Sequence, residues 1–138
     1  MRPWVEKAYG IPPEQVIGSS VKTKFQIVDG KPELLRLPEL NFIDDGPGKP
    51  EGINQHIGRR PIAAFGNSDG NQQMLKWTAA GGGPRLRLLV PPHRRGERVC
   101  LRPQLQLRQA GQSLDEANAK RWTVVSMKDD WKMIFPSQ

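Results

Sequence analysis

The feature that most constrains the fold is an apolar run followed by a polar glycine loop and a helical pattern. Residues 60–65 form a compact apolar run of strand length, which favours a buried strand. Residues 66–71 are a polar loop with two glycines, and residues 72–80 have the pattern of a helix. A second buried strand is expected at Leu86–Val90. Strand, loop, helix and strand in this order predict an α/β fold with a parallel sheet.

The segment before this unit is predicted to form short elements, because glycine and proline interrupt it often. Residues 3–9 favour a short helix that stops at Gly10, and a strand is expected to begin near Gln15–Ile17. Residues 24–28 and 33–37 alternate around Asp29-Gly30, which predicts a β-hairpin.

Further helices and strands are expected on both sides of the central unit. Pro50 is placed to open a helix through Ile57, with Gly58 as its stop. Ser113 and Glu116 have the spacing of a capping box, which predicts a helix from Ser113 to about Lys120. We expect a strand at residues 122–126 and a terminal helical turn at residues 129–134. The whole chain, residues 1–138, is predicted to form one domain.

The net charge of +7 comes mostly from one stretch. Residues Arg85–Arg108 hold seven arginines and one acid, Glu97, whereas the rest of the chain is close to neutral. Such a stretch favours binding to nucleic acid or to an anionic surface. It has no interleaved aromatic residue and no recognisable binding module, so a solvated basic loop is the alternative.

Several classes of protein are excluded by what the chain lacks. It has no apolar run of about 18 residues, so we expect no membrane span. It has no secretory signal, which favours a cytoplasmic location by default. Cys100 is the single cysteine, and His56 and His93 have no metal-ligand spacing.

The loop at residues 66–71 is the best candidate for chemistry, since ligands bind outside the carboxyl ends of strands in open α/β sheets. Gly66 and Gly70 let the backbone approach a ligand, and the N-terminus of the following helix suits phosphate. Four side chains supply the oxygen ligands that Mg²⁺ prefers: Asn67, Ser68, Asp69 and Asn71. The alternative is a polar turn in which Asp69 or Asn71 caps the helix.

Residues 63–75 resemble the fourth motif of the haloacid dehalogenase superfamily, an apolar strand followed by Gly-Asp/Asn-Ser-x-x-Asp and a helix with Met-Leu. The resemblance covers about residues 1–90 and 112–136, including Phe42-Ile-Asp-Asp, Gly48-Lys-Pro and Trp122-Thr-Val-Val. It implies a Rossmann-like core with a small β-hairpin insertion. It also implies a Mg²⁺-dependent phosphohydrolase that acts on a small phosphorylated substrate through an aspartyl-phosphate.

The resemblance also implies a role for each matching residue. Lys49 would steady the nucleophile and the transferring phosphoryl group, whereas its alternative is an ordinary exposed loop lysine. Asn67, Asp69 and Asn71 would lie at the metal. Gly66, Ser68 and Gly70 would form the loop near the phosphate.

The chain departs from the family pattern at sites that matter for catalysis. Asn71 stands where the pattern has Asp, so metal affinity should fall. The nucleophile motif Asp-x-Asp-x-Thr is absent, as is the Ser or Thr motif for phosphate. Asp44 and Asp45 mimic the first of these, but we expect them to be solvated loop acids. The chain thus resembles a C-terminal half of its relatives, with reduced or no activity.

Residues 91–112 form an arginine-rich segment in which the resemblance is lost. A compensated pair of reading-frame shifts would produce this pattern, and His93 and Cys100 would then be accidental. Two other functions stay open. One is binding to nucleic acid through Arg85–Arg108. The other is a non-catalytic interaction fragment that associates with itself through an exposed sheet edge.

Overall fold

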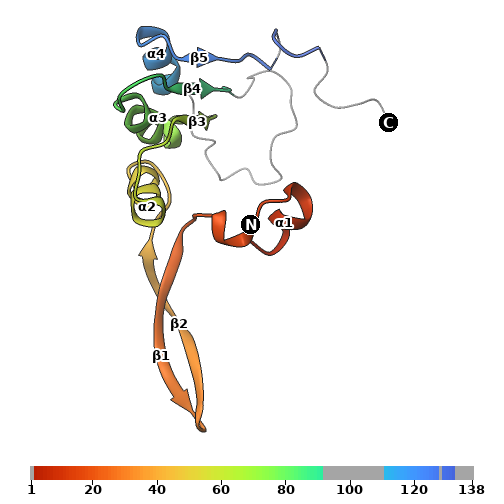
Figure 1. Ribbon diagram of the computed structural model, residues 1–138, viewed down its shortest axis with the longest axis vertical. Helices are drawn as coiled ribbons and strands as arrows, with labels where there is room; N and C mark the ends of the chain where they lie inside the picture. The colour runs from red at the N-terminus through yellow and green to blue at the C-terminus, as the bar shows by residue number, and fades with distance from the viewer. Residues whose placement is uncertain (1, 92–110, 128, 133–138) are drawn as a thin grey trace. The chain divides into compact units, whose positions relative to one another are not determined.

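The computed structural model describes residues 2–91, 111–127 and 129–132. The chain divides into two compact units, Met1–Gly58 and Arg59–Gln138, and each is described by itself. The first contains an antiparallel hairpin and the second a parallel three-stranded sheet with helices (Figure 1). The α/β class and the parallel sheet predicted from the sequence are therefore confirmed. Among the described residues, no helix is both long and apolar enough to cross a membrane.

The first unit begins with α1 (Arg2–Tyr9), which ends as predicted at Gly10. Gly10 has a positive φ of 65°, and its N–H donates to the carbonyl of Glu6. The strand expected near Gln15–Ile17 is wrong, because Pro13–Gln15 form a 3-10 turn, η1. Pro13 has its φ held near the helical value, which favours a turn there.

The hairpin consists of β1 (Ser20–Val28) and β2 (Lys31–Phe42) and is longer than predicted. Asp29 and Gly30 both have positive φ, of 50° and 74°, which is the backbone of a tight two-residue hairpin turn. Figure 1 shows the two strands as a long twisted ribbon. The ribbon has only two strands, so large apolar side chains remain exposed on it: Phe25, Ile27, Leu34 and Leu40.

Helix α2 (Gly48–Ile57) begins two residues before the predicted start at Pro50. Pro50 fits in the first turn of the helix, because the backbone N–H groups of that turn have no hydrogen-bond partner within the helix and proline lacks only this group. A Cβ at Gly48 would collide with the carbonyl oxygen of Ile43, so the chain can make this close approach only with glycine. The helix ends at Gly58, which has a φ of 72°, as predicted.

The sheet of the second unit has the strand order β3-β4-β5, with all pairs parallel. The strands are β3 (Ala63–Gly66), β4 (Leu86–Leu89) and β5 (Thr123–Val124), each shorter than the predicted run. Phe65 has 59% of its surface exposed. This exposure is unusual, because both faces of a parallel sheet are usually covered.

The core of the second unit joins the sheet to α3 (Gln72–Ala79) and α4 (Gly111–Ala119). A single-turn 3-10 helix, η2 (Asp69–Asn71), precedes α3. Both helices contribute to one buried apolar cluster, which consists of Ala64, Leu75, Leu89, Ala117 and Trp122.

The expected capping box at the start of α4 is wrong. The helix begins at Gly111, and Ser113 lies fully buried within it. Glu116 turns to α3 and accepts from Gln72 and Lys76, because these partners are available in the packed unit. Residues 129–132 form no helix, and residues 133–134 of the predicted terminal turn lie outside the described residues.

Candidate functional site

The candidate loop follows the carboxyl end of β3, where the sequence places it. Gly66 is the last residue of the strand, and a Cβ there would lie 2.7 Å from Asn71 Cβ and 3.3 Å from Leu75 Cδ1. Because glycine has no Cβ, Asn71 can fold back against the end of the strand. This contact shapes the loop.

Three of the predicted site residues come together in the loop. Asn71 Nδ2 donates to Asn67 Oδ1 over 3.2 Å and to Ser68 Oγ over 3.1 Å. Asn71 occupies the N-cap position of α3, but its side chain makes no capping hydrogen bond there. The alternative in which Asn71 caps α3 is therefore wrong, because its amide is engaged within the loop.

Asp69 has a different partner from the one expected. Its Oδ1 accepts a hydrogen bond of 2.8 Å from the backbone N–H of Ser113 in α4. Asp69 therefore caps the N-terminal turn of α4, which satisfies one of the N–H groups that a helix start leaves unpaired. Gly70 is buried beside it in η2.

The oxygen donors of this loop do not fit a tight Mg²⁺ site as they are arranged. The amide of Asn71 presents its N–H donors, not its oxygen, to Asn67 and Ser68. One oxygen of Asp69, the loop's single carboxylate, is already engaged by α4. Within residues 2–91, 111–127 and 129–132, no group of three His, Cys, Asp or Glu could hold a metal ion. A divalent cation is bound best by several carboxylate or carbonyl oxygens that converge on it.

Lys49 belongs to the first unit, whereas the loop belongs to the second. Its Nζ lies 3.6 Å from Asp44 Oδ2, and the two side chains are 24% and 18% exposed. The expectation that Asp44 and Asp45 are solvated is wrong. Both are partly buried, because the loop before α2 folds against its own backbone, and Asp45 Oδ1 accepts from the N–H of Gly46.

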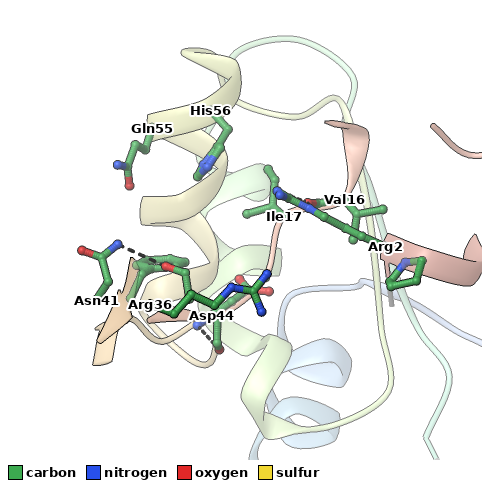
Figure 2. A pocket seen from close by; sticks show the side chains of 13 residues that line it. Arg2, Val16, Ile17, Arg36, Asn41, Asp44, Gln55 and His56 are labelled. Atoms are coloured by element: carbon green, nitrogen blue, oxygen red, sulfur yellow. Dashed lines mark hydrogen bonds between the residues drawn. The ribbon is translucent and has the colours of Figure 1, made fainter. Parts of the chain in front are cut away.

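A pocket of about 750 Å³ lies within the first unit. Figure 2 shows Arg2 and Arg36 extending into it from opposite sides, with His56 and Gln55 contributed by α2. The other polar side chains that line it are Ser19, Ser20, Asn41 and Asp44.

Hydrogen bonds hold several of these side chains in place. Ser19 Oγ accepts from the N–H of Asp44 over 2.9 Å, and Ser20 Oγ accepts from Asn41 Nδ2 over 3.1 Å. Arg2 donates from Nε and Nη2 to the carbonyl of Val16 over 2.9 and 2.8 Å. These contacts join α1, the segment before β1 and the base of the hairpin into one lining.

The pocket carries positive charge. Lys49 offsets the carboxylate of Asp44, which leaves the guanidinium groups of Arg2 and Arg36. His56 Nδ1 lies 2.9 Å from the carbonyl of Gly52 and must be the donor, because a carbonyl only accepts. An anionic ligand with hydroxyl groups matches this lining best.

Sequence reasoning missed Arg2, Arg36 and His56 as lining residues. They lie in α1, β2 and α2, and no local spacing relates them, so only folding brings them together. His93, Cys100 and most of the arginine-rich segment lie outside the described residues. Of the seven arginines in the stretch Arg85–Arg108, the structure describes Arg85 and Arg87.

Comparison of the chain with protein-family models and with curated proteins found no match.

Proposed function

We propose that this chain is part of a haloacid dehalogenase-like phosphohydrolase with a Rossmann-like core, and that its own hydrolytic activity is reduced or absent. The observation that carries the proposal is the loop with Asn67, Ser68 and Asn71 at the carboxyl end of β3. Open α/β sheets bind their ligands at this edge.

The substrate class that we propose is a small phosphorylated compound. The pocket of the first unit supports this proposal, because two guanidinium groups in it have a charge and shape that suit phosphate oxygens. Ser19, Ser20 and Asn41 add hydroxyl and amide groups that can form hydrogen bonds with the rest of such a compound.

The chemistry of the loop supports low activity of the chain by itself. The residue at position 71 is an amide, which removes one negative charge from the proposed metal position. The chain also contains no Asp-x-Asp-x-Thr sequence to supply the aspartyl nucleophile. We therefore expect weak Mg²⁺ binding and no substantial turnover.

The proposal is tested by Asn71→Asp with calorimetric titration of Mg²⁺. We expect the affinity for Mg²⁺ to rise by about tenfold or more, since a carboxylate at this position restores an anionic oxygen ligand. Asn118→Asp is the matched control, because it makes the same chemical change at an exposed position of α4. Equal affinities for the two variants would contradict the proposed metal position.

A second measurement tests the activity. Release of phosphate from an aryl phosphate with Mg²⁺ present is expected to stay at the uncatalysed rate for the chain. Robust turnover would contradict the proposal that the chain has reduced or no activity.

A further inference from the structure

Three arginines lie partly buried at the amino ends of the parallel strands. Arg60 precedes β3, while Arg85 precedes β4 and Arg87 lies within it. Each guanidinium donates from Nη1 to a backbone carbonyl: Arg60 to Trp77, Arg85 to Pro61 and Arg87 to Arg85. We call these three residues the arginine cluster.

Arg60 and Arg85 lie close together around Gly81, just after α3. A Cβ at Gly81 would lie 2.7 Å from Arg85 Nε and 3.0 Å from Arg60 Cδ. The Cζ atom of Arg60 also lies 4.8 Å from the centre of the Trp77 ring, a cation–π contact that fixes its orientation. The cluster is therefore an ordered arrangement of positive charges.

The charges of the arginine cluster are not balanced within the described part of the chain. Four lysines there pair with carboxylates: Lys22, Lys49, Lys76 and Lys120. No described carboxylate lies within 4.0 Å of Arg60, Arg85 or Arg87. The Nε atoms of Arg85 and Arg87 are buried without a described acceptor.

Arginine cannot relieve this repulsion by losing its proton, because the guanidinium group stays charged in proteins. The negative end of α3 offsets only about half a charge, whereas the cluster carries three. An anion with several oxygens would neutralise the charges of the cluster. Phosphate fits best, because its oxygens match the fork of a guanidinium.

We infer that the arginine cluster binds a phosphate group. This site is separate from the proposed catalytic loop, because the cluster lies at the amino ends of β3 and β4, whereas the loop follows the carboxyl end of β3. The phosphate can belong to a free small molecule or to a nucleic-acid backbone, and the two sources are distinguished by experiment.

The test is a calorimetric titration of the full chain with pyrophosphate. Arg85→Gln should weaken binding by about tenfold or more, as expected for the loss of charge-assisted hydrogen bonds. Arg121→Gln is the matched control, because Arg121 is exposed in the same unit. Equal affinities for these two variants would overturn the inference.

A pair of glycine variants tests the geometry without changing the charge. Gly81→Ala should displace the side chains of Arg85 and Arg60 and weaken binding, while the fold persists because flexible side chains can move. Gly82→Ala is its control, since a Cβ there meets nothing within 4 Å. Thermal unfolding of each variant checks that the fold is retained, and unchanged binding by Gly81→Ala would count against the cluster.

A parallel titration with a short single-stranded oligonucleotide identifies the source of the phosphate. Binding of pyrophosphate alone assigns a free small phosphate, and stronger, salt-dependent binding of the oligonucleotide assigns a nucleic-acid backbone. If neither ligand binds, the inference is wrong.

Discussion

The backbone N–H of Ser113 donates a hydrogen bond of 2.8 Å to Oδ1 of Asp69. The two residues are 44 positions apart in the chain, so the contact connects the loop after β3 to the first turn of α4. The negative carboxylate also lies at the positive end of the helix dipole. Asp69, which the sequence suggests as a metal ligand, therefore binds the start of α4 instead.

Removal of this carboxylate should destabilise the protein. Asp69→Ala is expected to lower the free energy of unfolding by about 1 kcal/mol, since it leaves an N–H at the start of α4 unpaired. Urea unfolding followed by circular dichroism measures the change. Asp115→Ala, an exposed site in the same helix, should have a smaller effect. Equal losses in the free energy of unfolding for the two variants would show that the contact of Asp69 with Ser113 does not stabilise the protein.

The carboxylate of Glu116 should make stability depend on pH. Burial of this side chain raises its pKa, but hydrogen bonds from Lys120 and Lys76 and their charges outweigh burial and hold the pKa below its ordinary value of 4.5. The folded state therefore favours the ionised form, so the unfolded state binds more protons at low pH. The stabilisation is complete above pH 4.5 and is lost as the pH falls through the lower pKa of the folded state.

Glu116→Gln tests this dependence. At pH 7 it should lower the free energy of unfolding by about 1 kcal/mol, because the two lysines lose their ion pairs. The difference from the unmodified chain should shrink as the pH falls below 4.5. Asp115→Asn serves as the exposed control. A difference that stays constant down to pH 3 would contradict the assignment.

Substitution of Gly66 should disturb the candidate loop. Gly66→Ala places a Cβ 2.7 Å from Asn71 Cβ, so either the strand end or the loop must shift. We expect a loss of about 1–3 kcal/mol in the free energy of unfolding, typical of overpacking. Gly82→Ala meets no neighbour within 4 Å and is the control in the same thermal unfolding series. If the two variants have the same unfolding temperature, the close approach of Asn71 to Gly66 does not contribute to stability.

The exposed apolar face of the hairpin should cause self-association. Phe25 and Leu34 are cross-strand partners on one face and are 63% and 69% exposed. Large exposed apolar patches on soluble chains favour association. Phe25→Thr should reduce the apparent mass at high protein concentration in sedimentation experiments. Leu35→Thr, on the opposite face, should reduce it less. If the chain sediments as a monomer at every concentration, this prediction is wrong.

Much of the local structure could be predicted because it depends on neighbouring residues. Asp29-Gly30 predicts the hairpin turn because both residues tolerate positive φ. Gly10 and Gly58 end their helices for the same reason. The capping box at Ser113 failed, although its spacing is correct, because tertiary packing buries Ser113 and turns Glu116 toward Lys76.

The candidate loop was predicted at its correct place, but the partners of its side chains were not. The order of strand, loop and helix around residues 66–71 follows from the local pattern of apolar residues. Local sequence patterns are therefore sufficient to predict the α/β class, the hairpin and the position of this loop. Tertiary contacts, in contrast, establish that Asp69 caps α4, that Arg2 and Arg36 line one pocket, and that Arg60 and Arg85 meet at Gly81. The physical reason is that backbone preferences act between neighbouring residues, whereas these contacts form between residues far apart in the chain.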